Sequence, residues 1–146
     1  TGQVPEGYYE TPLTAKIARR GKHLTVVTVS ITLLDAMKAR DELVQQGIFL
    51  EIIDLRWLRP IDVNPIVQSI RKTGRLLVVD TGWKSCSISS EIVALIAERA
   101  HGYLKSAPRR ITLPDAPCPA SQYLEPLYHP NPEMIVQTVE EMVGKN

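Results

Sequence analysis

Three kinds of side chain in this sequence could do chemistry: a cysteine in a turn, a few histidines, and acids that follow apolar segments. Cys86 lies in the turn "TGWKSCS" after the apolar segment 75–80, where a nearby base would make it a nucleophile. A helix beginning after this turn would also lower the pKa of the thiol. No histidine lies close to Cys86 in the sequence, so a small residue in a turn is the simpler interpretation. The serines of the turn are more typical of a helix cap than of a nucleophile.

The histidines and the acids do not form a site in this pattern. His23, His101 and His129 lie in three separate parts of the chain, so we expect surface histidines rather than metal ligands. Asp54 and Asp80 each end an apolar segment, where an acid usually binds neighbouring backbone N–H groups or an arginine. The sequence therefore predicts no catalytic residue and no metal-binding residue.

Loops that cradle phosphate are missing from the pattern as well. A dinucleotide fingerprint requires GxGxxG directly after a strand, but the apolar segment 24–29 is followed by "SITLLD". The pair Gly21-Lys22 lacks the earlier glycine of a Walker loop. No cofactor-binding residue is predicted.

Composition and charge restrict the possible partners. The chain is 44% hydrophobic with a net charge of +1, and no block of lysines and arginines interrupts it, so we expect a globular domain that does not bind nucleic acid. No apolar run approaches the ~18 residues of a membrane span, and "TGQVPEGYYETP" lacks the core of a signal peptide. Cys86 and Cys118 form no CxxC pair, which favours a reducing compartment: the cytoplasm, or the mitochondrial matrix in a eukaryote. Because the chain begins with Thr, we expect it to be a piece of a longer protein.

Two kinds of apolar pattern alternate along the chain, and the strands and helices that they predict must position the residues considered above. β-branched or continuously apolar runs predict strands, and stripes at spacings of three and four predict helices. Asp62 is expected to cap the second helix, and Gly47 and Gly74 to end the first and second. The proline-rich segment 114–132 is expected to lead the chain back to the last helix. The predicted strands are 15–19, 24–29, 48–54, 75–80 and 109–113, and the predicted helices are 35–46, 62–74, 90–104 and 133–143.

This alternation predicts an α/β sandwich with a parallel sheet and right-handed crossovers. In such sheets ligands bind at the carboxyl ends of the strands. The stretch "DLRWLRPID" stands at one of those ends and crowds charge and aromatic area together.

Four stretches resemble a known family: "IDLRWLRPID", "SIRKTGRLLVVDTGW", "SSEIVALIAE" and "PDAPCPASQYLEPLYHPNPEMIV". They are similar to the carboxy-terminal domain of the transketolase superfamily, in particular to the β subunit of thiamine-diphosphate-dependent 2-oxoacid dehydrogenases of the pyruvate and branched-chain type. The resemblance covers essentially the whole chain. One departure is the turn before the third helix, where Ser85, Ser87, Ser89 and Ser90 replace a glycine-rich segment.

The resemblance implies a three-layer α/β/α sandwich around a mostly parallel sheet of five strands in the order 1-3-2-4-5, with the first strand antiparallel. Residues 1–14 would be a linker from a missing pyrimidine-binding domain, and residues 15–146 would be the transketolase C-terminal-like domain. The catalytic residues and the sites for thiamine diphosphate and magnesium would lie elsewhere in the full enzyme, with none in this domain.

The resemblance also implies a role in assembly. The partners would be a second β subunit, a companion α subunit and the acyltransferase core, within an enzyme that decarboxylates a 2-oxo acid and passes the acyl group to a lipoyl arm. We expect five residues to lie in protein interfaces: Arg56, Trp57, Arg59, Trp83 and Lys84. An alternative for part of this set is intramolecular, with Arg56 paired to Asp54 or Glu91 and Trp57 covering the first helix.

Two other functions remain open at this point. The chain could be the same domain of a transketolase or a deoxyxylulose-phosphate synthase. It could instead be a stand-alone module that binds a small anion or nucleotide at the point where the strand order reverses. Ser30, Thr32 and Thr81 would line that crevice.

Overall fold

The computed structural model describes Gly7 and residues 13–144, and its centre is a five-stranded sheet in the order β1-β3-β2-β4-β5. The predicted linker 1–14 therefore lies almost entirely outside the described residues. The strands are β1 (Lys16–Arg19), β2 (Leu24–Thr28), β3 (Leu50–Asp54), β4 (Leu76–Trp83) and β5 (Arg109–Leu113). The helices are α1 (Thr32–Gln45), α2 (Asn64–Thr73), α3 (Ile88–Ala100), the 3-10 turn η1 (His101–Tyr103), α4 (Glu125–Tyr128) and α5 (Pro132–Val143).

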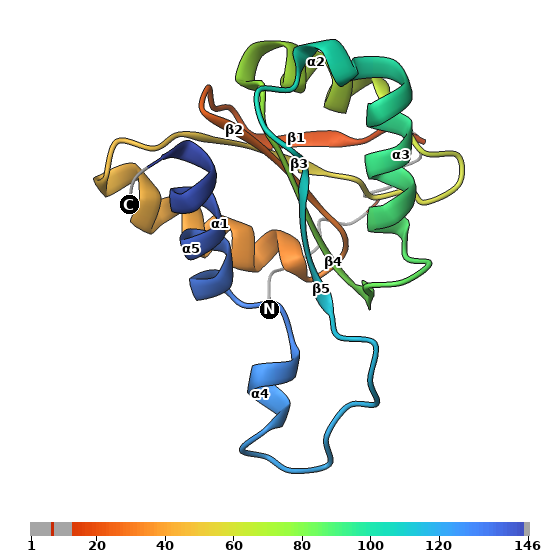
Figure 1. Cartoon of the computed structure of the whole chain (residues 1–146), viewed down its shortest axis with the longest axis vertical. Helices are drawn as coiled ribbons and strands as arrows, with labels where there is room; N and C mark the ends of the chain where they lie inside the picture. The colour runs from red at the N-terminus through yellow and green to blue at the C-terminus, as the bar shows by residue number, and fades with distance from the viewer. Residues whose placement is uncertain (1–6, 8–12, 145–146) are drawn as a thin grey trace.

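The predicted strand order and direction are confirmed. β1 pairs with β3 antiparallel, whereas β2 pairs in parallel with both β3 and β4, and β4 pairs in parallel with β5. Helices α2 and α3 cover one face of the sheet, and α1 and α5 cover the other (Figure 1). The result is the expected three-layer sandwich.

Alternation along the central strands divides the core into two halves. In β4, Leu77 and Val79 pack toward α1 and α5, while Leu76 and Val78 pack toward α2 and α3. All four side chains are fully buried, and burying a side chain of this size contributes about 1.5–3 kcal/mol. This two-sided burial explains why the predicted strands read as continuous apolar runs.

Glycines fix two of the connections. Gly21, in the turn between β1 and β2, lies so close to β3 that a Cβ atom would stand 2.1 Å from the carbonyl carbon of Leu50. Gly74 ends α2 in the left-handed conformation, with φ of 72°, as predicted. Gly47 also follows the end of α1 with φ of 77°, so both predicted stops are confirmed.

Several predicted boundaries need correction. Helix α1 begins at Thr32 instead of 35, and β3 begins at Leu50 instead of 48. Strand β4 continues through Trp83, so much of the predicted turn belongs to the strand. The Asp62 cap is also wrong: α2 follows Val63, and the Asp62 carboxylate instead accepts the N–H of Ala15 at 3.2 Å. The backbone of Ala15, near the start of the domain, therefore binds the Asp62 side chain in place of the N-terminus of α2.

The proline-rich segment returns the chain to α5, but by way of an arm that projects from the body of the domain (Figure 1). We call residues 114–131 the arm. The short helix α4 lies within the arm, and most side chains of the arm are exposed, with Tyr128 and Pro130 buried.

Candidate functional site at the carboxyl edge of the sheet

Because β2, β3, β4 and β5 run in parallel, their carboxyl ends meet at one edge of the sheet. Each predicted site residue lies at this edge. The residues after β2 are Ser30 and Thr32, those after β3 are Arg56, Trp57 and Arg59, and those at the tip of β4 are Thr81, Trp83 and Lys84. The edge was thus located correctly, although its residues differ in what they can bind.

The residues predicted to line an anion crevice lie at the carboxyl ends of the neighbouring strands β2 and β4. The segment after β2 lies against β4, since the N–H of Val29 donates to the carbonyl of Val79 at 3.3 Å. Thr32 is 1% exposed, and its hydroxyl contacts the carbonyls of Val29 at 2.8 Å and Val79 at 3.0 Å. It also accepts the N–H of Val29 at 3.0 Å. The Thr32 hydroxyl is therefore occupied by the backbone and not available to an anion, whereas Ser30 is exposed and Thr81 half-buried.

The loop after β3 presents apolar surface to water. Trp57 is 37% exposed and Leu58 49% exposed. Arg56 adopts a left-handed backbone with φ of 59°, and its backbone N–H hydrogen-bonds to Asp54. Burial raises the pKa of Asp54, and this hydrogen bond and the charge of Lys16 oppose the increase. The corner is therefore held by its own backbone while the Trp57 ring remains accessible.

Asp80 organises the tip of β4. It is 3% exposed, and its carboxylate accepts the N–H of Gly82 at 2.9 Å and that of Ser89 at 3.3 Å. The second bond satisfies a donor in the first turn of α3. Ser87 occupies the cap position without a side-chain cap bond, and its hydroxyl contacts that of Ser89 at 2.5 Å. The predicted binding of Asp80 to backbone N–H groups is confirmed, and this acid replaces the predicted serine cap.

The root of the arm is fixed to the tip of β4. Asp115 accepts the N–H of Ser85 at 2.9 Å and its hydroxyl at 2.7 Å. These bonds lower the pKa of Asp115, and the charges of Lys84 and Arg110 lower it further. The indole of Trp83 donates to the Tyr128 hydroxyl at 3.2 Å, and that hydroxyl donates to the carbonyl of Ala116.

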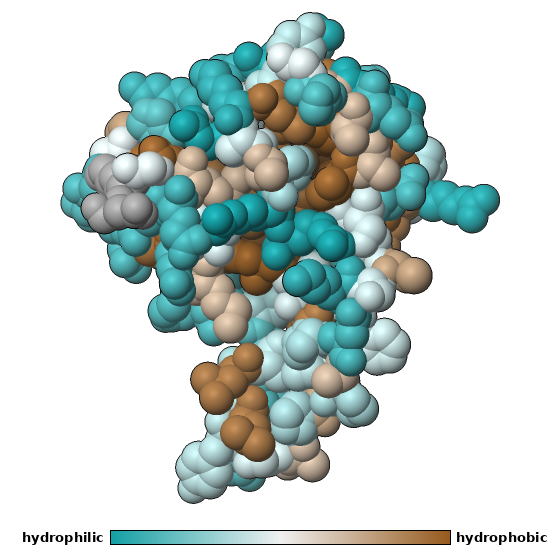
Figure 2. All heavy atoms as spheres, in the orientation of Figure 1, coloured by the Kyte–Doolittle hydropathy of each residue, from teal (hydrophilic) through white to brown (hydrophobic). Residues whose placement is uncertain are grey.

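The tip of the arm is apolar and accessible. Tyr123 is 89% exposed, Leu127 70% and Leu124 52%. Figure 2 shows hydrophobic side chains gathered on this projecting part of the molecule. Together with Trp57, Leu58 and Trp83, which is 59% exposed, they form a series of large apolar groups along the carboxyl edge. The sequence signal for the arm was a run of aromatic and leucine residues without any strand or helix period.

The residues first considered for chemistry have ordinary surroundings. Cys86 is an exposed free thiol with φ of 56°, and no histidine is among the described residues lining the cavity beside it. Nδ1 of His23 accepts the N–H of Phe49 at 3.0 Å, as expected for a satisfied surface histidine. In residues 13–144 no cluster of three or more His, Cys, Asp or Glu side chains could hold a metal ion. No helix in the described part is both long and apolar enough to cross a membrane.

A buried acid between β3 and α2 was not anticipated. Glu51 is 2% exposed and is bound by the ammonium of Lys72, the N–H of Gly21 and Ser69. Burial acts to raise its pKa, but the three hydrogen bonds and the charge of Lys72 outweigh that effect and lower the pKa. An open cavity of about 740 Å³ lies beside this pair. An acid within an otherwise apolar strand was the available signal.

Comparisons with known proteins agree with the architecture. The model of the family "Transketolase, C-terminal domain" matches residues 13–135. The chain is 39% identical over 145 residues to the β subunit of acetoin:2,6-dichlorophenolindophenol oxidoreductase from Bacillus subtilis, covering 99% of this chain and 42% of that protein. It is 40% identical over 131 residues to the mitochondrial pyruvate dehydrogenase E1 component subunit beta of Ascaris suum, covering 89% and 36%.

A solved structure, a split-gene transketolase as an inactive β4 tetramer, superposes with a TM-score of 0.80 at 22% identity. The match covers 97% of this chain and 47% of that one, and at this identity it supports the fold alone. The chain spans about two fifths of the length of the two relatives.

Proposed function

Since the chain belongs to the transketolase C-terminal domain family, we propose that it is the assembly domain of the β subunit of a thiamine-diphosphate-dependent enzyme that oxidises a 2-oxo acid. In this proposal the domain contributes contacts to a second β subunit, a companion α subunit and the acyltransferase core. The parent enzyme decarboxylates the 2-oxo acid and transfers the acyl group to lipoyl. The isolated domain performs no chemical step.

One observation carries this proposal: the carboxyl edge, where α/β domains usually bind ligands, exposes large apolar groups instead. Trp57, Trp83 and Leu127 all stand there with more than a third of their surface accessible. Tryptophan and arginine are enriched where interfaces are buried, and Arg56 and Arg59 flank Trp57. Arg56, Trp57, Arg59, Trp83 and Lys84 therefore remain our proposed interface residues.

Magnesium does not fit the described residues, which contain no cluster of three acidic or histidine side chains to bind it. When bound, thiamine diphosphate would supply the carbanion chemistry of the parent enzyme. We assign thiamine diphosphate and magnesium to other parts of the parent protein. We place that protein in the cytoplasm or, in a eukaryote, in the mitochondrial matrix.

A second substrate class is favoured by a specific observation. The Bacillus subtilis relative is named for acetoin and matches 99% of this chain, whereas the Ascaris suum relative is named for pyruvate. A parent enzyme that oxidises acetoin would use the same assembly domain. Assays of the full-length parent with pyruvate, branched-chain 2-oxo acids and acetoin would separate the two classes.

Two measurements test the proposed role. We expect the isolated chain to show no turnover of these substrates and no rise in melting temperature with thiamine diphosphate and magnesium. In the full-length parent, the double substitution Trp57→Ala and Arg59→Ala should weaken subunit association in sedimentation velocity. Turnover by the isolated chain, or an unchanged sedimentation profile of the parent variant, would contradict the proposal.

A further inference from the structure

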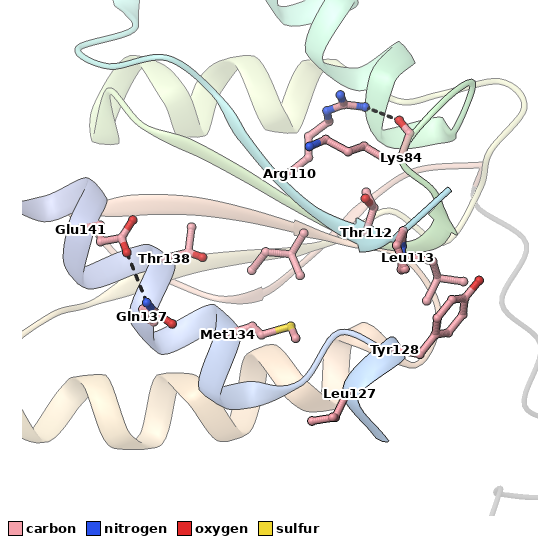
Figure 3. A pocket seen from close by; sticks show the side chains of 12 residues that line it. Lys84, Arg110, Thr112, Leu113, Leu127, Tyr128, Met134, Gln137, Thr138 and Glu141 are labelled. Carbon is pink, nitrogen blue, oxygen red and sulfur yellow. Dashed lines mark hydrogen bonds between the residues drawn. The ribbon is translucent and has the colours of Figure 1, made fainter. Parts of the chain in front are cut away.

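A groove of about 480 Å³ runs along the outer edge of β5. Five consecutive residues, 110–114, line it. Successive side chains of a strand point to opposite faces of a sheet, so a cavity lined by consecutive residues must follow the edge of the strand. Figure 3 agrees, since Lys84 and Arg110 lie on one side of β5 and side chains of α5 lie on the other.

The main chain along this edge can bind another strand. β5 is the last strand in the sheet, so one of its two edges has no neighbouring strand among the described residues. An open edge presents backbone N–H and C=O groups, which can pair with an added extended segment. The opposite edge of the sheet is formed by β1, which pairs antiparallel with β3.

The walls of the groove define the chemistry of its occupant. Lys84 and Arg110 line one side, and Arg110 reaches the carbonyl of Lys84 at 2.8 Å and the Ser90 hydroxyl at 2.6 Å. The Asp115 carboxylate accepts two hydrogen bonds from Ser85, and its negative charge offsets part of the charge of the two cations.

The other side of the groove is less charged. Met134 and Leu127 contribute apolar surface there, next to the amide of Gln137. The acid on this side, Glu141, forms an ion pair with Arg109. Two cations and one carboxylate thus give the Lys84 side a net positive charge, whereas Arg109 and Glu141 balance each other on the other side. Acidic side chains would therefore be attracted to the Lys84 side.

We infer that this groove binds an extended acidic segment of a partner protein, which adds to the sheet as a strand beside β5. Its acidic side chains face Lys84 and Arg110, and its apolar side chains lie on Met134 and Leu127. The backbone pairing provides affinity and the cations select the charge. The inference shares Lys84 and Leu127 with the proposed interface and names one partner chemistry for that surface, but the isolated chain is sufficient to test it separately from subunit association.

The test uses fluorescence anisotropy with a labelled synthetic peptide in which glutamate alternates with valine, and with copies carrying glutamine or lysine in place of glutamate. We expect the glutamate peptide to bind at least about tenfold more tightly than the glutamine copy, with an affinity that falls as salt increases. Lys84→Glu should weaken its binding by about tenfold or more. Gln137→Trp, which fills the groove from an exposed position of α5, should weaken binding of the glutamate peptide without changing the charge.

Lys38→Glu is the matched control, because Lys38 lies on α1 with its side chain 71% exposed. This variant should bind like the wild type, and circular dichroism should show that every variant is folded. Equal binding of the glutamate and glutamine peptides, or wild-type affinity in both groove variants, would overturn the inference. Displacement of the peptide by inorganic phosphate at equal concentration would identify a small-anion site and would overturn it as well. A chain that is dimeric in sedimentation velocity and is dissociated by the peptide would show a second copy as the natural occupant, again contradicting an acidic partner.

Discussion

The buried carboxylate of Glu51 is bound by the ammonium of Lys72, with Glu51 2% and Lys72 44% exposed. The Glu51 carboxylate is buried, whereas the Lys72 side chain is partly exposed, and both residues line the same cavity. Ser69 continues the polar contacts inward, because its hydroxyl lies 2.6 Å from that of Thr25, which lies 2.7 Å from that of Thr73. The network joins β2, β3 and α2, so Glu51 connects the sheet to one covering helix.

The first prediction concerns pH. The folded-state pKa of Glu51 lies below the ordinary value of 4.5, so its contribution to stability is present above that pH and is lost as pH falls through the folded pKa. Urea unfolding at several pH values should show that wild type and Glu51→Gln differ most near neutrality and converge in acid. A constant difference across this range would contradict the assignment.

A second prediction concerns the interaction energy of the Glu51–Lys72 ion pair. Glu51→Gln and Lys72→Met should each cost about 1–3 kcal/mol of unfolding free energy, since each leaves a buried or partly buried group without its charged partner. The double variant should cost less than the sum of the two, because the interaction can be lost only once. Additive losses in chemical denaturation would show that the two side chains act independently.

Asp54 should behave in the opposite way to Glu51. Its pKa is raised by burial, so its favourable contribution is present below the ordinary pKa of 3.8 and is lost as pH rises through the folded value. Asp54→Asn should therefore be as stable as the wild type or more stable at neutral pH. A thermal melt at neutral pH that shows clear destabilisation would contradict this sign.

Gly21 provides a prediction about close packing. Gly21→Ala would place a Cβ atom 2.1 Å from backbone of Leu50, which cannot move aside like a flexible side chain. We expect a loss of about 1–3 kcal/mol or more, because the turn must shift away from β3. Gly102→Ala is the control, since no atom lies within 4 Å of its Cβ position, and its melting temperature should change little.

The cap of α3 can be tested through Asp80. Asp80→Ala removes the acceptor for Gly82 and Ser89, and should cost about 1–2 kcal/mol in chemical denaturation, as the loss of a helix cap does. Asp41→Ala serves as the comparison, because the Asp41 side chain is 73% exposed and contacts only its neighbour Arg40 in the described ion pairs. Equal stability of the two variants would show that Ser87 or another group caps the helix.

The sequence pattern was sufficient to predict the central strands because β2, β3 and most of β4 are buried, whereas the strand order was predicted from the family resemblance. Runs such as 76–79 are continuously apolar, and Gly47 and Gly74 mark helix ends with positive φ. Local patterns could not predict which side chain binds which backbone group. Asp62 has the composition of a cap, yet a segment 47 residues away binds it. Thr32 looks available for an anion, yet neighbouring carbonyls occupy its hydroxyl.

The candidate site was likewise predictable in part from the sequence. The carboxyl edge could be located from the alternation of strands and helices, and Trp57 and Trp83 were identified there from residue type. The groove beside β5 could not be predicted, because it brings Lys84, Arg110 and α5 together from separate parts of the chain. The arm was also missed, since its exposure depends on where its root is fixed to β4.

The arm has a hydrogen-bonded root and an apolar tip, which has a consequence for the behaviour of the purified domain. In the folded domain, large apolar side chains of the arm remain exposed to solvent: Tyr123, Leu124 and Leu127. Such a surface favours association between native molecules. We therefore expect concentrated samples to aggregate while their circular dichroism is still that of the folded protein. On heating, light scattering should increase at a lower temperature than the unfolding transition.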